Sequence, residues 1–160
     1  MNADGFRRVL SNFCTGIVVI TAYDDAGPTG LTCQSFTSLS LDPPLVVFSV
    51  GRASTSWPRV RAAGVFAVNI LNADQQDVSH AFATRRGEKF IGIDWTPGHR
   101  GAPLLDHAVA HIECTLDAVH DGGDHEIVLG RVTALRESNP GAEPLLYFRS
   151  RYRQLRPEST

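Results

Sequence analysis

Apolar and polar residues alternate in short blocks along this chain, and their spacing predicts many short strands with a few short helices between them. The first helix is expected over residues 4–13, with Asp4 as its N-cap. Its apolar residues fall on one stripe at helical spacing: Phe6, Val9, Leu10 and Phe13. Two further helices are expected over 54–63, where Gly64 follows the last turn, and over 73–84.

β-Branched and alternating segments predict the strands. They are expected at 16–23, 30–36, 45–50, 65–71, 111–118, 126–137 and 144–155. Breaks rich in Asp, Gly and Pro are expected at 24–28, 42–44 and 121–124, and a polar loop at 85–103. About seven short strands without a regular strand–helix–strand alternation favour an antiparallel barrel over a doubly wound parallel sheet.

Composition identifies an ordinary globular chain. Its 160 residues are long enough to form one domain over 1–160 with a core of its own. A content of 42% hydrophobic and 20% charged residues excludes the disordered, collagen-like and coiled-coil classes. No apolar run reaches the roughly 18 residues of a membrane span, and no signal-peptide pattern follows Met1, so we expect a cytoplasmic protein that does not enter a membrane.

Charge and cysteine content narrow the range of partners. The net charge of −2 provides no positive field for nucleic acid or an anionic membrane. Alternate arginines occur near the C-terminus: Arg149, Arg151 and Arg153. They could contact RNA, but protection of an edge strand or an interface is the favoured interpretation. Three widely separated cysteines predict free thiols in a reducing compartment rather than a disulfide or metal site: Cys14, Cys33 and Cys114.

Residues 30–40 are polar but uncharged, in a segment otherwise suited to burial. They read Gly-Leu-Thr-Cys-Gln-Ser-Phe-Thr-Ser-Leu-Ser. Buried hydroxyl and amide groups need hydrogen-bond partners, which neighbouring strands can supply. The functional interpretation is a neutral, hydrogen-bonding wall for a planar ligand such as the edge of a flavin ring or another heterocycle.

Hydroxyl side chains gather where the helix over 54–63 is expected to begin. Helix capping alone explains one of Ser54, Thr55 and Ser56. Three hydroxyls in a row beside Arg52 also favour an anion site, because backbone N–H groups and the helix dipole point toward such a position. Phosphate binding is therefore the favoured interpretation.

The charged loop 85–90 contains the only lysine of the chain, Lys89. Such loops are usually just solvated. If this one folds over the barrel, however, Arg86 and Lys89 reach the same phosphate as Ser54 and Thr55. The chain has no G-x-G-x-x-G run and no P-loop, so any nucleotide is held outside those two binding modes.

The segment 120–125 reads His-Asp-Gly-Gly-Asp-His and is expected to be a hairpin turn. Its histidines and aspartates could bind a metal, but the central Gly-Gly is what a turn requires. No helical spacing of ligands supports a metal site, so none is expected. His125 begins a strand and could instead face a pocket as a neutral donor near a ring. The absence of a G-x-S-x-G elbow gives hydrolysis no support.

In their order along the chain, these segments resemble the flavin reductase family with the FMN-binding split-barrel fold. They are most similar to the small reductase components of two-component flavin-dependent aromatic monooxygenases, over Phe6 to about Leu155. The motifs are Phe6-Arg-Arg-Val-Leu10, Thr15-Gly-Ile-Val-Val-Ile-Thr21, the segment 30–44, Ser54-Thr-Ser-Trp57, Phe66-Ala-Val-Asn-Ile-Leu71, Lys89-Phe90, Gly123-Asp-His125 and Leu145-Leu-Tyr-Phe-Arg…Tyr152. One departure is Gln34 before Ser35, where many members carry Asn.

The resemblance implies a mainly β fold with short helices, an antiparallel, Greek-key-like split barrel, and a homodimer with flavin at the subunit interface. Five matching positions would line the isoalloxazine: Gly30, Thr32, Cys33, Gln34 and Ser35. Others would hold the ribityl-phosphate end: Ser49, Arg52, Ser54, Thr55 and Ser56, with Lys89 and Phe90 closing over it. His125, the expected catalytic residue, and Tyr152 would lie near the nicotinamide.

The implied reaction is hydride transfer from NADH or NADPH to FMN or FAD. Reduced flavin would then diffuse to a separate monooxygenase that acts on an aromatic or similar organic substrate. The cofactors supply the chemistry and the protein stacks nicotinamide C4 against flavin N5, so no general base is needed and His125 positions rather than titrates. The alternative is a non-catalytic flavin storage or transfer module of the same fold.

Overall fold

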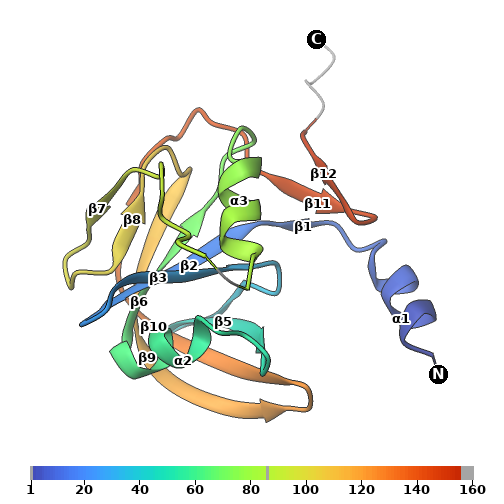
Figure 1. The fold of residues 1–160 in the computed structure, drawn as a ribbon, viewed down its shortest axis with the longest axis horizontal. Coiled ribbons are helices and arrows are strands. Elements are labelled where there is room, and N and C mark those ends of the chain that lie inside the picture. Colours follow the sequence, from blue (N-terminus) through green and yellow to red (C-terminus); the bar gives the residue numbers. More distant parts are fainter. Residues whose placement is uncertain (1, 86, 156–160) are drawn as a thin grey trace.

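Seven antiparallel strands form the main sheet. In the computed structural model, which describes residues 2–85 and 87–155, their order is β3-β2-β6-β9-β10-β5-β4 (Figure 1). The strands are β2 (Val18–Asp24), β3 (Gly27–Cys33), β4 (Thr37–Leu41), β5 (Pro44–Gly51), β6 (Val65–Ile70), β9 (Ala110–Gly122) and β10 (His125–Glu137). The predicted mainly β, antiparallel class is confirmed.

Two smaller sheets and three short helices complete the described chain. One small sheet joins β1 (Thr15–Gly16), β11 (Leu146–Phe148) and β12 (Arg151–Arg153), and the other pairs β7 (Trp95–Pro97) with β8 (Pro103–Leu105). The helices are α1 (Ala3–Leu10), α2 (Trp57–Ala63) and α3 (Gln76–Ala83). Gly64, with φ of +67°, ends α2 as predicted. None of the helices in the described chain has the length and apolar character needed to cross a membrane.

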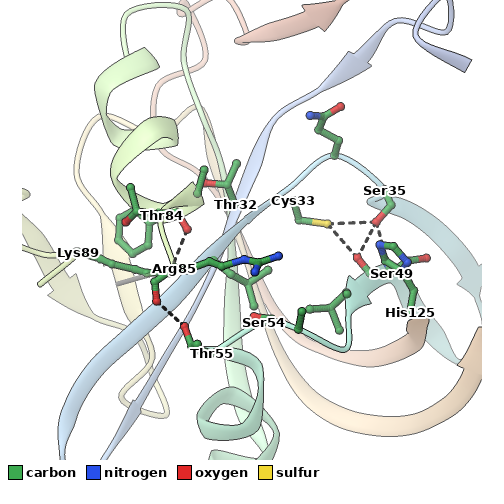
Figure 2. A pocket seen from close by; sticks show the side chains of 17 residues that line it. Thr32, Cys33, Ser35, Ser49, Ser54, Thr55, Thr84, Arg85, Lys89 and His125 are labelled. Atoms are coloured by element: carbon green, nitrogen blue, oxygen red, sulfur yellow. Dashed lines mark hydrogen bonds between the residues drawn. The ribbon is translucent and has the colours of Figure 1, made fainter. Parts of the chain in front are cut away.

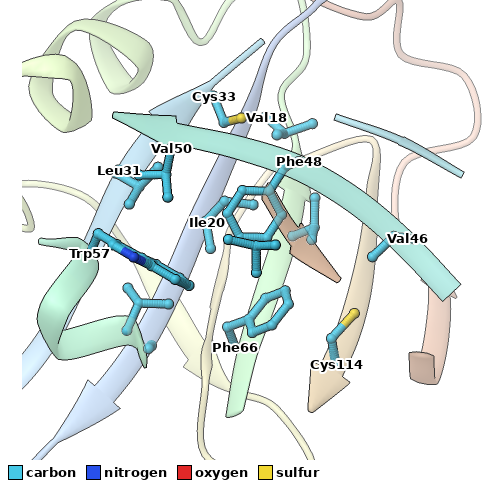
Figure 3. Close-up of a cluster of buried hydrophobic side chains, with 14 residues drawn as sticks. Val18, Ile20, Leu31, Cys33, Val46, Phe48, Val50, Trp57, Phe66 and Cys114 are labelled. Atoms are coloured by element: carbon cyan, nitrogen blue, oxygen red, sulfur yellow. The ribbon is translucent and has the colours of Figure 1, made fainter. Parts of the chain in front are cut away.

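The main sheet curls around its principal apolar cluster. The end strand β3 and the strand next to the other end, β5, both contribute to it, and Cys33 Sγ of β3 lies 3.7 Å from the carbonyl oxygen of Ser49 in β5. In Figure 3 the Phe48 ring is at the centre of the cluster, with its centroid 6.0 Å from that of Trp57 and 5.6 Å from that of Phe66. Burying each such ring contributes about 1.5–3 kcal/mol to stability, so this cluster holds β3 and β5 in place.

The close approach of α3 to β3 depends on Gly30. A Cβ atom built at this position would lie 2.8 Å from both the Phe82 ring of α3 and the carbonyl oxygen of Ile20. Phe82 is fully buried, so it has no space into which to withdraw. A residue without a side chain is therefore required where the helix presses on the sheet.

The two termini of the chain differ from the sequence predictions. The N-cap of α1 is Asn2, not Asp4, because the Asn2 side chain accepts a hydrogen bond of 2.7 Å from the backbone N–H of Gly5. The predicted strand over 144–155 is wrong, since β11 and β12 form a hairpin with a turn at Arg149 and Ser150. Both turn residues have positive φ although neither is a glycine, and this turn takes Arg149 out of the predicted row of arginines.

Four other differences from the predictions are smaller. The predicted loop 85–103 contains β7, and the edge strand β4 was not predicted. The break at 24–28 is shorter than expected, because Pro28 belongs to the edge strand β3, a position that tolerates proline. The helix predicted over 54–63 begins only at Trp57.

The helix α1 stands away from the body of the protein (Figure 1). It buries none of its residues. The helix predicted over 4–13 ends at Leu10, so Phe13 follows it. The residues of the predicted apolar stripe are each more than half exposed: Phe6, Val9, Leu10 and Phe13. The stripe therefore has no apolar partner among the described residues.

Candidate functional site

One cavity of about 510 Å³, called here the main cavity, brings together most of the predicted site residues. Its lining comes from segments 31–35, 49–51, 53–55 and 82–85, with Lys89 and His125. Figure 2 shows His125 on one side of this space and Lys89 on the other. The volume lies within the range of about 300–1,000 Å³ typical of small-molecule sites.

The sheet side of the main cavity is fixed by hydrogen bonds between β5 and the end of β3. Ser35 Oγ donates to the Ser49 carbonyl oxygen at 2.9 Å and accepts from the Ser49 N–H at 2.8 Å. Thr32 Oγ1 donates to the carbonyl oxygen of Ser79 in α3 at 2.7 Å. Neighbouring strands and a helix thus supply hydrogen-bond partners to these hydroxyls. Thr32 and Ser35 also line the cavity.

Cys33 contributes a neutral, apolar patch to the same wall. Its Sγ lies 3.2 Å from Ser35 Oγ, and its side chain is almost fully buried. Burial raises the pKa of the Cys33 thiol above its usual value. The thiol therefore stays protonated and adds no negative charge to the wall.

The opposite side of the main cavity carries hydroxyls and a guanidinium group. Thr55 Oγ1 donates to the Arg85 carbonyl oxygen at 2.7 Å, which ties the segment before α2 to the loop after α3. The Arg85 side chain extends between the two sides of the cavity (Figure 2). Among the described residues, Arg85 forms no ion pair within 4.0 Å. An anionic group bound beside Ser54 and Thr55 would therefore find a cation there.

Lys89 borders the cavity but uses its ammonium group to join three parts of the fold. Nζ donates to the carbonyl oxygens of Gly30 and Phe82, each at 3.1 Å, and to Ser56 Oγ at 2.9 Å. Partial burial lowers the pKa of Lys89 from its usual value, while the three acceptors favour its charged form. All three N–H donors are occupied, so Lys89 contributes mainly its charge to the cavity.

Arg52 does not line the main cavity. Its Nε donates to the Gly123 carbonyl oxygen at 2.8 Å, and its guanidinium pairs with Asp121 and, at 3.5 Å, with Glu126. The hydrogen bond and charge of Arg52 lower the pKa of Asp121. Arg52 thus fastens the end of β5 to the β9–β10 hairpin, which carries His125.

His125 lies at the first position of β10 with its ring half exposed. Its Nδ1 is 2.7 Å from Asp124 Oδ1, and this hydrogen bond lowers the pKa of the Asp124 carboxyl group. A carboxylate only accepts, so Nδ1 is the donor in this hydrogen bond and Nε2 is the ring nitrogen that stays available to a ligand. The ring lies over the end of β5, where a Cβ atom at Gly51 would be at ordinary contact distance, 3.6 Å, from Nε2.

Tyr152 lies in a neighbouring cavity of about 470 Å³, called here the aromatic cavity. Its ring centroid is 5.1 Å from that of His80 and 5.3 Å from that of Tyr147, and its hydroxyl oxygen is 2.9 Å from Ser79 Oγ. Ala83 and Thr84 line both this cavity and the main one. Tyr152 is therefore adjacent to the main cavity rather than part of its lining.

The structure separates the predicted site residues into three groups. Those that line the main cavity are Thr32, Cys33, Gln34, Ser35, Ser49, Ser54, Thr55, Lys89 and His125. Those that lie outside its lining are Gly30, Arg52, Ser56, Phe90 and Tyr152. Arg86 lies outside the described residues.

Arg85 and Thr84 are lining residues that the sequence reasoning missed. The sequence contains two adjacent arginines, Arg85 and Arg86. Which of them faces the cavity cannot be predicted without knowing where the preceding helix ends. In the predicted turn 120–125, as elsewhere in the described chain, no group of three or more His, Cys, Asp or Glu side chains is placed to hold a metal ion.

Comparison with known proteins identifies the family. The family described as "Flavin reductase like domain" matches residues 10–156. This chain belongs to that family. The reductase subunit HsaB of a flavin-dependent monooxygenase from Rhodococcus jostii (strain RHA1) is 46% identical over 155 residues, covering 97% of this chain and 79% of the relative. The predicted family is therefore confirmed.

Solved structures of similar proteins agree with this assignment. Nitrilotriacetate monooxygenase component B from Mycobacterium thermoresistibile is 48% identical, with a TM-score of 0.93 over 98% of this chain and 88% of that one. NADH:FAD oxidoreductase SgcE6 from Streptomyces globisporus C-1027, solved with NAD and FAD fragments, is 38% identical, with a TM-score of 0.93 over 99% of this chain and 96% of that one. The predicted class of activity, a nicotinamide-dependent flavin reductase, is confirmed for the family.

Proposed function

We propose that this protein transfers a hydride from NADH or NADPH to FMN or FAD and releases the reduced flavin to a separate monooxygenase. The observation that carries the proposal is the layout of the main cavity in a member of this family. A neutral wall at 31–35 faces one part of it, Arg85 and Lys89 give it a cationic end, and His125 stands on the other side. Among the described residues, its lining contains no Asp or Glu.

The neutral wall suits the isoalloxazine ring, and the cationic end suits its phosphate. When bound, the flavin supplies the hydride acceptor and the nicotinamide supplies the hydride. Cys33 and Ser35 present a thiol and a hydroxyl that the sheet holds in place. Ser54, Thr55 and Arg85 offer hydroxyl and guanidinium donors, which form strong charge-assisted hydrogen bonds to a phosphate. Holding both ends fixes the ring against the wall and leaves its outer face for the nicotinamide.

His125 is the proposed contact to the nicotinamide, and Asp124 orients its ring. The bond from Nδ1 to Asp124 leaves Nε2 for a ligand in the cavity. The His125→Ala variant should therefore raise the KM for NADH about tenfold, the equivalent of about 1.4 kcal/mol, and change flavin affinity less. Steady-state kinetics and flavin titration measure the two effects. Equal losses for NADH and flavin would contradict this role.

A homodimer with the split-barrel form belongs to the same proposal. The curling of the main sheet, which brings Cys33 of β3 to Ser49 of β5, supports the barrel. The exposed apolar side chains of α1 and of Phe13, just after it, support the dimer, because an exposed apolar surface usually marks an interaction site. Sedimentation of wild type and of Phe13→Asp tests the dimer, and a wild-type monomer would contradict it.

The free cysteines suit a cytoplasmic location, and the proposal treats residues 1–160 as one domain.

The activity is tested by following NADH oxidation by the purified protein with FMN, with FAD and with no added flavin. Turnover that requires added flavin is expected, since the family is one of flavin reductases. Tight flavin binding without NADH or NADPH oxidation would contradict the proposal and indicate a storage module instead.

A further inference from the structure

The strand end that carries His125 has no apolar packing of its own. Residues 120–125 read His-Asp-Gly-Gly-Asp-His, and all of them are exposed. His125 also forms the last pair of β10 with each neighbouring strand, opposite Gly122 in β9 and Gly51 in β5. Because no aliphatic side chain holds the tip of this hairpin, the position of the His125 ring in the main cavity depends on polar contacts beside it.

Glu126, the next residue along β10, makes the contacts that reach furthest into the fold. Successive strand residues point to opposite faces, so Glu126 points away from the main cavity, which His125 lines. The Glu126 carboxylate accepts from Trp57 Nε1 and, at 3.2 Å, from Arg61, both of which belong to α2. The Arg52 guanidinium lies 3.5 Å from the same carboxylate. Glu126 thus joins β10 to α2 and to the end of β5.

Trp57 makes the contact to Glu126 a fixed one. The Trp57 side chain is 4% exposed, and its ring lies edge-on to Phe48 in the principal apolar cluster (Figure 3). The Glu126 side chain is 15% exposed, so its charge depends on donors from the protein more than on water. The hydrogen bond from Trp57 therefore ties the start of β10 directly to the core.

The other side-chain tie to the hairpin is more exposed. It is the ion pair of Arg52 with Asp121, whose side chains are 48% and 80% exposed. Ion pairs in contact with water contribute little to stability, because solvent screens the charges. Of the two ties, the one through Glu126 is therefore the firmer.

We propose that Glu126 is a positioning residue, which through Trp57 holds the start of β10 so that the His125 ring stays in the main cavity. This inference rests on the proposed function, in which His125 contacts the nicotinamide. Glu126 does not line the main cavity, so it acts on the ligand only through His125. Loss of Glu126 should weaken the binding of NADH and leave the flavin, which other walls hold, in place.

The test measures the KM for NADH, kcat and the Kd of FMN for the Glu126→Ala variant. The KM for NADH should rise about fivefold, while kcat at saturating NADH and the Kd of FMN stay within about twofold of wild type. Glu126→Gln keeps the side-chain length and an acceptor for Trp57, so its KM should return to within about twofold of wild type. Asp117→Ala is the matched control, because Asp117 pairs with Arg131 across the same two strands and neither residue lines the main cavity. This control should leave the KM unchanged.

The double variant of Glu126→Ala and His125→Ala separates positioning from a general loss of structure. Two residues that act through one contact are not additive, so the double variant should have the KM for NADH of His125→Ala alone. If Glu126→Ala does not fold, Trp57→Phe takes its place, because it removes only the N–H donor and keeps an aromatic ring in the core. Trp57→Phe should raise the KM about threefold in wild type and have no effect in the His125→Ala background.

Four results would overturn the proposal. They are an unchanged KM for NADH in Glu126→Ala, an effect that adds to that of His125→Ala, an equal rise in the Kd of FMN, and a Glu126→Gln variant that behaves as Glu126→Ala does. A His125→Ala variant with the wild-type KM for NADH would instead contradict the proposed role of His125. A wild-type protein that oxidises neither NADH nor NADPH would contradict the proposed function itself, so the three kinds of failure are distinguished.

Discussion

The two sides of the main cavity are built in different ways. The sheet side, at 31–35 and 49–51, belongs to strands that pack on the principal core, and its polar groups bond to one another. The loop side, at 82–85 with Lys89, follows the end of α3. Thr55 holds it through the Arg85 carbonyl oxygen, and Lys89 holds it through Gly30 and Ser56. The sheet side is suited to define the shape of a ring site. The loop side supplies charge, and its position depends on a few polar contacts.

The largest expected effect comes from breaking the tie between the two sides. The Lys89→Met variant removes three hydrogen bonds, two to the carbonyl oxygens of Gly30 and Phe82 and one to Ser56 Oγ. Because a hydrogen bond contributes about 0.5–1.5 kcal/mol net, the free energy of unfolding should fall by about 3 kcal/mol. Urea denaturation measures it. A loss of flavin affinity at unchanged stability would show that Lys89 acts only on the ligand.

The next effect concerns the point where the two sides press together. In the Gly30→Ala variant the new methyl group would lie 2.8 Å from the buried Phe82 ring. Overpacking of this kind costs about 1–3 kcal/mol, so we expect about 2 kcal/mol of destabilisation in the same denaturation experiment. Gly16→Ala is the matched control, since no atom lies within 4 Å of a Cβ atom there. Equal effects of the two changes would contradict the close-contact explanation.

The Arg85→Ala variant separates the charge of the loop side from its structure. Loss of the Arg85 guanidinium should raise the Kd for FMN about tenfold, or about 1.4 kcal/mol, because one charge-assisted contact to the phosphate disappears. Riboflavin has no phosphate, so its Kd should change little. Arg52→Ala, an arginine that does not line the main cavity, serves as the comparison. A similar change for riboflavin and FMN would argue against a phosphate contact by Arg85.

The smallest effect concerns an ion pair outside both sides. Arg52 lowers the pKa of Asp121 below the usual value of 3.8, so the folded protein holds this carboxylate ionised more strongly than the unfolded chain does. Its stabilisation is therefore complete above pH about 4 and is lost as the pH falls through the lowered pKa. In Asp121→Asn, the decline of unfolding free energy below pH about 4 should be shallower than in wild type. Parallel acid profiles would contradict this linkage.

The sequence predicted the sheet side better than the loop side, for physical reasons. β-Branched runs such as 16–23 and 45–50 need burial on a sheet, so their strands could be recognised from composition alone. The segment 30–35 could be placed at the site because its uncharged polar groups had to be satisfied or bind a ligand.

The loop side depends on contacts between residues distant in sequence. The three acceptors of Lys89 come from Gly30, Ser56 and Phe82, and no local pattern announces them. Arg86 was predicted to reach the phosphate, but Arg85 lines the cavity, and predicting this would have required knowing where α3 ends. At the C-terminus, the turn at Arg149 and Ser150 was missed because neither residue carries the usual glycine or asparagine signal.

The central claim is that the protein reduces flavin and releases the reduced flavin. The most direct measurement mixes a small amount of protein with excess NADH and a larger excess of flavin without oxygen, and follows the absorbance of oxidised flavin. The account predicts many turnovers, with one NADH consumed for each flavin reduced, until one reactant is exhausted. Bleaching that stops at one flavin for each subunit would contradict it, because the reduced flavin would then remain bound.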